Sequence, residues 1–153
     1  MTEKAQPEDL AFLSRTATEF VEISFETDLY AHICTRLREL AGDVPVVVAS
    51  YDKVPGTFTP RAFQGAPKVI DLYMKTAGVN PIGKEYHLSA AAAETMHARH
   101  MKPVTIDLYE LSEHTVPALV CRAAEMAMNL GSIYAMGFTR MNELLGCASI
   151  FMP

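Results

Sequence analysis

The sequence lacks tryptophan, has only three cysteines, and contains no apolar run long enough to span a bilayer. The cysteines, Cys34, Cys121 and Cys147, are odd in number and show no Cys-x-x-Cys spacing, which excludes a disulfide scaffold and a cysteine-based zinc finger. Basic residues are in the minority, since 13 Lys and Arg face 18 Asp and Glu, for a formal charge of −5. We therefore expect no nonspecific binding to nucleic acid or to anionic membranes.

The rest of the composition is typical of one globular domain. The chain has 153 residues, of which 50% are hydrophobic and 20% charged, which is enough to bury one core. The first nine residues are polar and acidic, unlike a secretory signal, and the unpaired cysteines favour a reducing, cytoplasmic environment. Nine methionines suit either an adaptable pocket or a soft core.

Two helices are predicted at the start of the chain. Pro7 to Glu19 has near-helical apolar spacing and predicts a short leading helix or a half-ordered arm. A stronger helix follows, with Thr27 as its expected N-cap and Gly42 at its end. Its apolar stripe consists of Leu29, Ile33, Leu37 and Leu40.

Two β-hairpins are predicted, one near each end of the chain. Val44 to Tyr51 is mostly β-branched and predicts a buried central strand, paired with Thr57 to Gln64, in which Pro60 favours an edge position. Ser132 to Thr139 and Leu144 to Phe151 form the second hairpin, with a polar loop of four residues.

The region between the hairpins is mainly helical in its pattern. The predicted segments are helices over Lys68–Thr76, from Ser89 toward His100, and Val116–Asn129, with short extended stretches at Glu85–Leu88 and Val104–Ile106. Two hairpins separated by helices predict an α+β fold, with a central antiparallel or mixed sheet of five to six strands and helices on both faces. The expected ligand site lies between this sheet and residues 85–128.

Several of these segments resemble a GAF domain, the small sensory module of signalling proteins. Thr27–Leu40 running into Val46–Tyr51 is similar to the first helix and strand of the family, and the closing hairpin, with Leu144-Leu145-Gly146 leaving its loop, is similar to the last two strands. More narrowly, the chain resembles the GAF sensor domains of archaeal, methanogen-like histidine kinases in two-component systems. The resemblance covers residues 20–153 and leaves 1–19 as an arm or short helix.

The resemblance implies a cytoplasmic signalling domain that couples a small ligand to a dimer interface. GAF domains usually end with a helix beside the first one, whereas this sequence stops at Met152-Pro153. Either the sequence is a piece of a longer chain or the domain stands alone, and its output kinase or regulator would be a separate partner. One sheet face would then be under-covered. We expect a homodimer through the Thr27–Leu40 helix or the preceding arm, unless that arm folds back over the face.

The resemblance also makes haem a candidate ligand. Some similar GAF domains hold haem through a histidine on the iron, and certain archaeal members join a cysteine to a haem vinyl group. The residues that it implies are His87, His97, His114, Cys121 and Met126, with His114 or His97 on the iron. His114 is the first choice, because a helix starting early enough would place it two turns before Cys121. Since no Cys-x-x-Cys-His motif is present, a buried structural thiol is the alternative for Cys121.

Other chemistry has little support in the sequence. His97 and His100 share a helix face, but Arg99 and Lys102 flank them, so a solvated polar face is favoured over a metal site. The chain has no Gly-x-Ser-x-Gly, P-loop or Gly-x-Gly-x-x-Gly motif, and we expect no enzyme. Two alternatives to the ligand sensor remain, a ligand-free dimerisation module and a GAF-type redox enzyme, whose cysteine pattern is not matched here.

Overall fold

The fold is built on one six-stranded antiparallel sheet with the strand order β3-β2-β1-β6-β5-β4. The computed structural model describes residues 6–78, 80–87, 89–91, 94, 102, 104–112, 114 and 116–153. The strands are β1 (Val46–Asp52), β2 (Thr57–Gln64), β3 (Tyr86–His87), β4 (Val104–Ile106), β5 (Ser132–Arg140) and β6 (Glu143–Met152). The predicted α+β class and strand number are confirmed.

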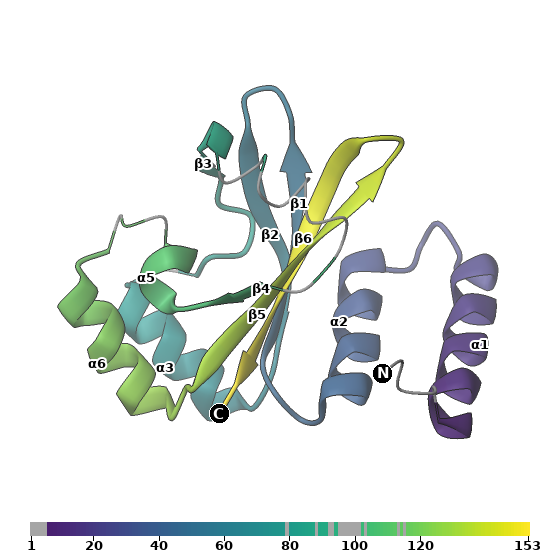
Figure 1. Cartoon of the computed structure of the whole chain (residues 1–153), viewed down its shortest axis with the longest axis horizontal. Coiled ribbons are helices and arrows are strands. Elements are labelled where there is room, and N and C mark those ends of the chain that lie inside the picture. The colour runs from purple at the N-terminus through teal and green to yellow at the C-terminus, as the bar shows by residue number, and fades with distance from the viewer. Residues whose placement is uncertain are drawn as a thin grey trace, which may run out of the picture.

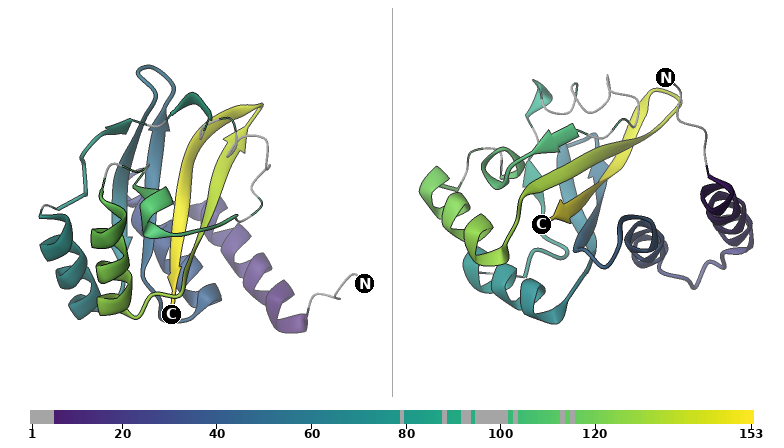
Figure 2. Two further views of the ribbon diagram at one scale, coloured as in Figure 1. Left: turned by 60° about the vertical axis from the view of Figure 1, so that its left-hand side comes forward. Right: turned by 60° about the horizontal axis from the view of Figure 1, so that its bottom comes forward.

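Helices cover both faces of the sheet, as predicted. They are α1 (Pro7–Glu22), α2 (Leu29–Ala41), α3 (Pro67–Ala77), α5 (Leu108–Leu111) and α6 (Ala118–Met128). Figure 1 shows α1 and α2 on one side of the sheet and α3, α5 and α6 on the other. The views of Figure 2 agree that α3 and α6 lie side by side. The predicted helix from Ser89 toward His100 falls largely outside the described residues.

Strand β1 supplies side chains to two separate cores. Val46 and Val48, which are 0% and 1% exposed, pack with Cys34 of α2 on one face. Val47 points to the other face and packs against the cluster that contains Ile133 and Cys121. Successive side chains of a strand alternate between faces, so a β-branched strand without polar alternation suits a sheet covered on both sides.

Strand β2 is an outer strand along most of its length. β3 pairs only with Thr57 and Phe58, at the beginning of β2. Pro60 lies beyond this pairing, opposite Ala49 where the register with β1 shifts, and its carbonyl accepts a hydrogen bond from Gly83 N–H at 2.8 Å. The predicted edge position of Pro60 therefore holds for this part of β2, where a residue without an N–H removes no ladder bond.

The closing hairpin is tighter than predicted. Arg140 pairs directly with Glu143, so the expected four-residue loop is a two-residue turn at Met141 and Asn142, with φ of 49° and 64°. Positive φ at both central residues matches the twist of the flanking strands, and asparagine tolerates this conformation. Further along β6, Gly146 lies so close to the carbonyl oxygen of Ala49 that a Cβ would collide with it.

The N-cap of helix α2 lies one residue later than predicted. Asp28, not Thr27, is the N-cap, and its carboxylate accepts hydrogen bonds from Tyr30 N–H and Ala31 N–H, both at 3.0 Å. Thr27 instead pairs through its hydroxyl with Ser24 at 3.1 Å. A side chain caps a helix only from the residue that precedes the first turn, which is why the nearby threonine was the wrong choice.

The predicted stripe of α2 is divided between core and solvent. Ile33 and Leu37 pack against the core cluster around Cys34. Leu29 and Leu40 remain 43% and 60% exposed. Half of the stripe is therefore used within the domain and is not free for a second chain.

Helix α1 is longer than the predicted arm and packs on α2 instead of covering the sheet. Figure 1 shows α2 between α1 and the sheet. Glu19 Oε2 lies 3.2 Å from Arg36 Nε and 3.6 Å from His32 Nε2. Glu39 of α2 accepts hydrogen bonds from Arg15 at 3.1 Å and from Arg36 at 2.7 Å. We call Arg15, Glu19, Arg36 and Glu39 the charged layer. No residue of α1 is buried.

Glu19→Gln is expected to loosen α1 from α2. The substitution removes the negative charge that Arg36 faces, at a cost of about 1 kcal/mol, or roughly fivefold in the opening equilibrium. Because an isolated helix of this length is marginal in water, opened α1 unfolds and its amides exchange faster. Hydrogen exchange over residues 7–22 measures this effect, with Glu22→Gln, at an exposed site of the same helix, as the control. Equal exchange in both variants would contradict the account.

Candidate functional site

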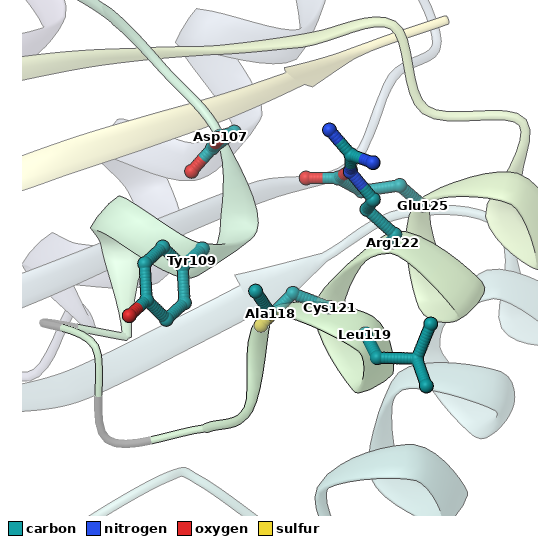
Figure 3. Close-up of a pocket in the computed structure, with 7 residues that line it drawn as sticks. All are labelled: Asp107, Tyr109, Ala118, Leu119, Cys121, Arg122 and Glu125. Carbon is teal, nitrogen blue, oxygen red and sulfur yellow. The ribbon is translucent and has the colours of Figure 1, made fainter.

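An open hollow of about 280 Å³ lies between α5 and α6, on the sheet face opposite α2. Figure 3 shows its seven lining residues, Asp107, Tyr109, Ala118, Leu119, Cys121, Arg122 and Glu125. All of them belong to residues 85–128, where the ligand site is predicted.

The two carboxylates of the hollow hold its walls together. Glu125 of α6 accepts a hydrogen bond from the backbone N–H of Leu108 at 2.8 Å, which joins α6 to the start of α5. Asp107 is the N-cap of α5 and accepts from Glu110 N–H at 2.8 Å, while the Glu110 carboxylate accepts from Asp107 N–H at 3.1 Å. These reciprocal bonds satisfy the free donors of the first turn, so both carboxylates already have structural roles.

Arg122 is the cation of the hollow. It is exposed, and no carboxylate in the described part of the chain pairs with it. Leu119, the Tyr109 ring and the Cys121 thiol provide apolar surface nearby. A guanidinium with open donors beside such surface suits a carboxylate or phosphate on an apolar molecule.

A second, shallower hollow of about 480 Å³ continues along α6. It shares Arg122 and Glu125 with the first hollow. Its other lining residues are Met126, Asn129, Leu130, Gly131 and Pro153. The two hollows together form a trough beside α6, and the side chains of Arg122 and Glu125 lie where the hollows meet.

Cys121 is the predicted site residue that the structure places in a wall of the first hollow. Its side chain is 4% exposed, and its thiol lies 3.8 Å from the carbonyl oxygen of Val116. Met126 lines the second hollow but is 84% exposed. A buried thiol beside a hollow fits both predicted readings, structural residue and ligand contact.

His114 does not lie on the same helix as Cys121, contrary to the preferred arrangement. Helix α6 begins only at Ala118, after Pro117, and His114 has a φ of 62°. Its N–H donates to the carbonyl of Tyr109 at 3.0 Å, and the two rings lie 4.3 Å apart. The left-handed backbone at His114 breaks the helical register that the sequence spacing assumed.

The remaining histidine candidates are not brought to the hollow by the described residues. His87 is exposed on β3, where it pairs with Thr57 at the far end of the strand order from β4. His97 and His100 lie outside the described residues. Within the described part of the chain, no group of three or more His, Cys, Asp or Glu side chains could hold a metal ion. The hollow of about 280 Å³ is close to the lower end of the usual size of ligand pockets.

Tyr109, Arg122 and Glu125 were not among the predicted site residues. The sequence contains a signal for Arg122 and Glu125. Together with Ala118 they are spaced four and three apart, so the three residues share a face of α6. Tyr109 falls in a stretch whose pattern was ambiguous, since α5 is a helix of only four residues.

Two of the three thiols are held in their protonated form. Desolvation raises the pKa of the Cys34 thiol to about 11 and that of the Cys147 thiol to about 12. The negative charge of Asp28 also raises the pKa of the Cys34 thiol. The thiolate is the reactive form of cysteine, so neither side chain is suited to redox chemistry near neutral pH.

In a Cys121→Ser variant, the two remaining thiols, Cys34 and Cys147, are expected to react very slowly with a disulfide reagent at pH 8. Only roughly one Cys34 thiol in a thousand is ionised there, and the reaction speeds up as the pH rises toward about 11. Absorbance of released thionitrobenzoate measures the rate. Denaturation in guanidinium chloride is the control and should release both equivalents quickly. Rapid reaction in the folded variant would show that these thiols are not held in their protonated form.

Comparison with known proteins identifies the fold through structure and not through sequence. No family model and no curated protein sequence matches the chain. No helix in the described part of the chain has the length and apolar character needed to cross a membrane.

Solved structures of GAF domains are similar over nearly the whole chain. The phycoerythrobilin-bound GAF domain of a cyanobacterial phytochrome superposes with a TM-score of 0.63 at 14% identity, covering 97% of this chain and 82% of that one. The GAF domain of the Acinetobacter phosphoenolpyruvate-protein phosphotransferase gives 0.60 at 11% identity, covering 96% and 78%. The chromophore-binding domain of Stigmatella aurantiaca phytochrome P1 gives 0.62 at 12% identity, and this chain spans 54% of it. The chain therefore has the fold of a GAF domain.

Proposed function

We propose that this chain is a sensory domain that binds a small anionic ligand in the hollow between α5 and α6. The observation that carries the proposal is Arg122, an unpaired cation in the described structure beside Tyr109, Leu119 and the buried Cys121. Such sites use apolar walls for affinity and a few polar groups for orientation.

The ligand class that suits these walls is a flat, largely apolar molecule with a carboxylate. The carboxylate would bind Arg122 and the apolar part would lie along Tyr109 and Leu119. Tetrapyrroles have this chemistry, and a structurally similar GAF domain holds phycoerythrobilin. Haem is proposed as the ligand on the sequence resemblance alone. Its candidate contacts are His114, His97, Cys121 and the other predicted residues.

The signal would pass through the sheet to the helical side. Val47 packs in the cluster with Cys121 on the ligand side, while Val46 and Val48 of the same strand pack against α2. A ligand shifts such a structure only if it favours one arrangement over another. We infer that α2 and α1 respond by changing their contact with a second copy of the chain.

The biological setting follows the resemblance to kinase sensor domains. The domain would act in the cytoplasm, without catalysis of its own, and its output would be a kinase or regulator. A ligand-free dimerisation module is the second candidate, and the apolar surface of α1 favours it, since Leu10 and Leu13 are 57% and 58% exposed.

Arg122→Gln is expected to weaken binding of hemin or biliverdin about tenfold or more, because a charge-assisted hydrogen bond contributes about 1.5–3 kcal/mol. Titration followed by absorbance measures the affinity, and a Soret band marks bound hemin. Arg140→Gln, at an exposed site in the closing hairpin, is the matched control and should bind as the unaltered protein does. Equal affinities in both variants would contradict the site. Failure of both tetrapyrroles to bind the unaltered protein would remove this ligand class.

A further inference from the structure

Two methionine side chains are exposed in the described part of the chain, and one of them lies in the trough beside α6. Met126 is 84% exposed and lines the second hollow, whereas Met141 is 87% exposed at the turn of the closing hairpin. Met128 and Met136 instead pack against the two cores. A thioether in water is open to oxidation and a packed one is shielded, so Met126 and Met141 are the accessible sulfurs of these four.

Met126 differs from Met141 in its neighbour along the chain. Arg122 precedes Met126 by four residues of α6, so the two side chains lie one turn apart on the same helix face, and both line the second hollow. Among the described residues that line either hollow, Arg122 is the one cation. The thioether of methionine is only a weak acceptor, so it does not compete with a ligand for the guanidinium.

Oxidation of Met126 would change the chemistry of this helix face. Methionine sulfoxide has a polar S=O oxygen that accepts hydrogen bonds, and it has no donor, so the carboxylate of Glu125 cannot pair with it. Arg122 and the amide of Asn129 are the side-chain donors that line the same hollow. A charged donor makes the stronger hydrogen bond, which favours the guanidinium of Arg122 as the partner of the new oxygen.

We propose that Met126 is a peroxide-sensitive modification site that controls the affinity of Arg122 for an anionic ligand. This rests on the proposed function, because it regulates the same guanidinium. A lone pair of the Met126 sulfur attacks one oxygen of hydrogen peroxide, and the O–O bond breaks. That oxygen stays on the sulfur, and the other leaves as water with both protons. The sulfur is oxidised by two electrons and the peroxide is reduced by them.

The expected loss of affinity on oxidation is about fivefold. Because both side chains are exposed, the contact between Arg122 and the sulfoxide accounts for about twofold, as for other pairs four residues apart on a helix surface. The remainder comes from covering the sulfoxide oxygen with a ligand, since removing a polar group from water is unfavourable. Methionine sulfoxide reductases restore the thioether, so the change is reversible.

Variants at the two exposed methionines test the proposal on the full chain. Glutamine resembles methionine sulfoxide in length and carries a carbonyl acceptor, so Met126→Gln imitates the oxidised residue. Met141→Gln is the matched control, at an equally exposed site outside the trough. Titration with hemin and with biliverdin, followed by absorbance, measures the affinity. We expect about fivefold weaker binding for Met126→Gln and the affinity of the unaltered chain for Met141→Gln.

Treatment with hydrogen peroxide tests the modification itself. Catalase then removes the peroxide, and dithiothreitol reduces oxidised thiols but leaves sulfoxides intact. Peptide masses should show one added oxygen atom on Met126 and one on Met141. Affinity should fall about fivefold in the treated unaltered chain and in treated Met141→Leu, and it should not change in treated Met126→Leu. A loss of affinity in treated Met126→Leu would assign the effect to another residue and overturn the proposal.

A measurement at Arg122 without ligand separates this proposal from the proposed function. Phenylglyoxal modifies free guanidinium groups, and its reaction with Arg122, followed by peptide mass, should slow about twofold in Met126→Gln and in the oxidised unaltered chain. An unchanged rate at Arg122 would overturn the proposal, as would equal tetrapyrrole affinities of Met126→Gln and Met141→Gln. A slowed reaction in a chain that binds neither tetrapyrrole would support the contact between Met126 and Arg122 and overturn the ligand class alone.

Discussion

Burial of β1 on both of its faces is the constraint on which the rest of the structure depends. Val46 and Val48 are enclosed by α2, and Val47 packs in the cluster of α5 and α6. A strand enclosed in this way cannot shift its register without moving apolar side chains between two cores. The helices on both faces of the sheet therefore pack on the same strand. A shift of β1 would move side chains in both cores.

The helices on the two sides of the sheet are held by different interactions. On the α5 and α6 side, carboxylates hold the walls through backbone hydrogen bonds, which leaves Arg122 as the open polar group. On the α2 side, the charged layer joins α1 to the domain, while Leu10 and Leu13 of α1 are exposed to solvent. A buried apolar face fixes position strongly, whereas α1 has no buried residue, so α1 is the element most able to change its contacts.

The regular parts of the fold were predictable from the sequence because they depend on local patterns. The β-branched run before Tyr51 and the two closing strands each have the residue pattern of a strand. The pairing of each strand in a hairpin could be predicted from these patterns. Asp28 as the cap of α2 and the two-residue turn at Met141 and Asn142 were missed, since both depend on one position in the register. The start of α6 was predicted to within two residues, at Val116 against the observed Ala118, but the helix does not extend back to His114, because Pro117 and the left-handed His114 precede it.

The candidate site was less predictable than the sheet. The sequence prediction selected histidine, cysteine and methionine because those residues ligate haem, and it did not include Arg122. What distinguishes Arg122 is that Glu125, one turn away, is already bonded to the backbone at Leu108.

We expect a ligand bound between α5 and α6 to change the contacts of α1 on the other side of the sheet. Hydrogen exchange of the full chain, with and without bound hemin, measures both regions in one experiment. We predict slower exchange over residues 107–125 together with a change over residues 7–22 that is lost in Arg122→Gln. Protection confined to residues 107–125, with no change in α1, would contradict the coupling, and protection that avoids residues 107–125 would contradict the site.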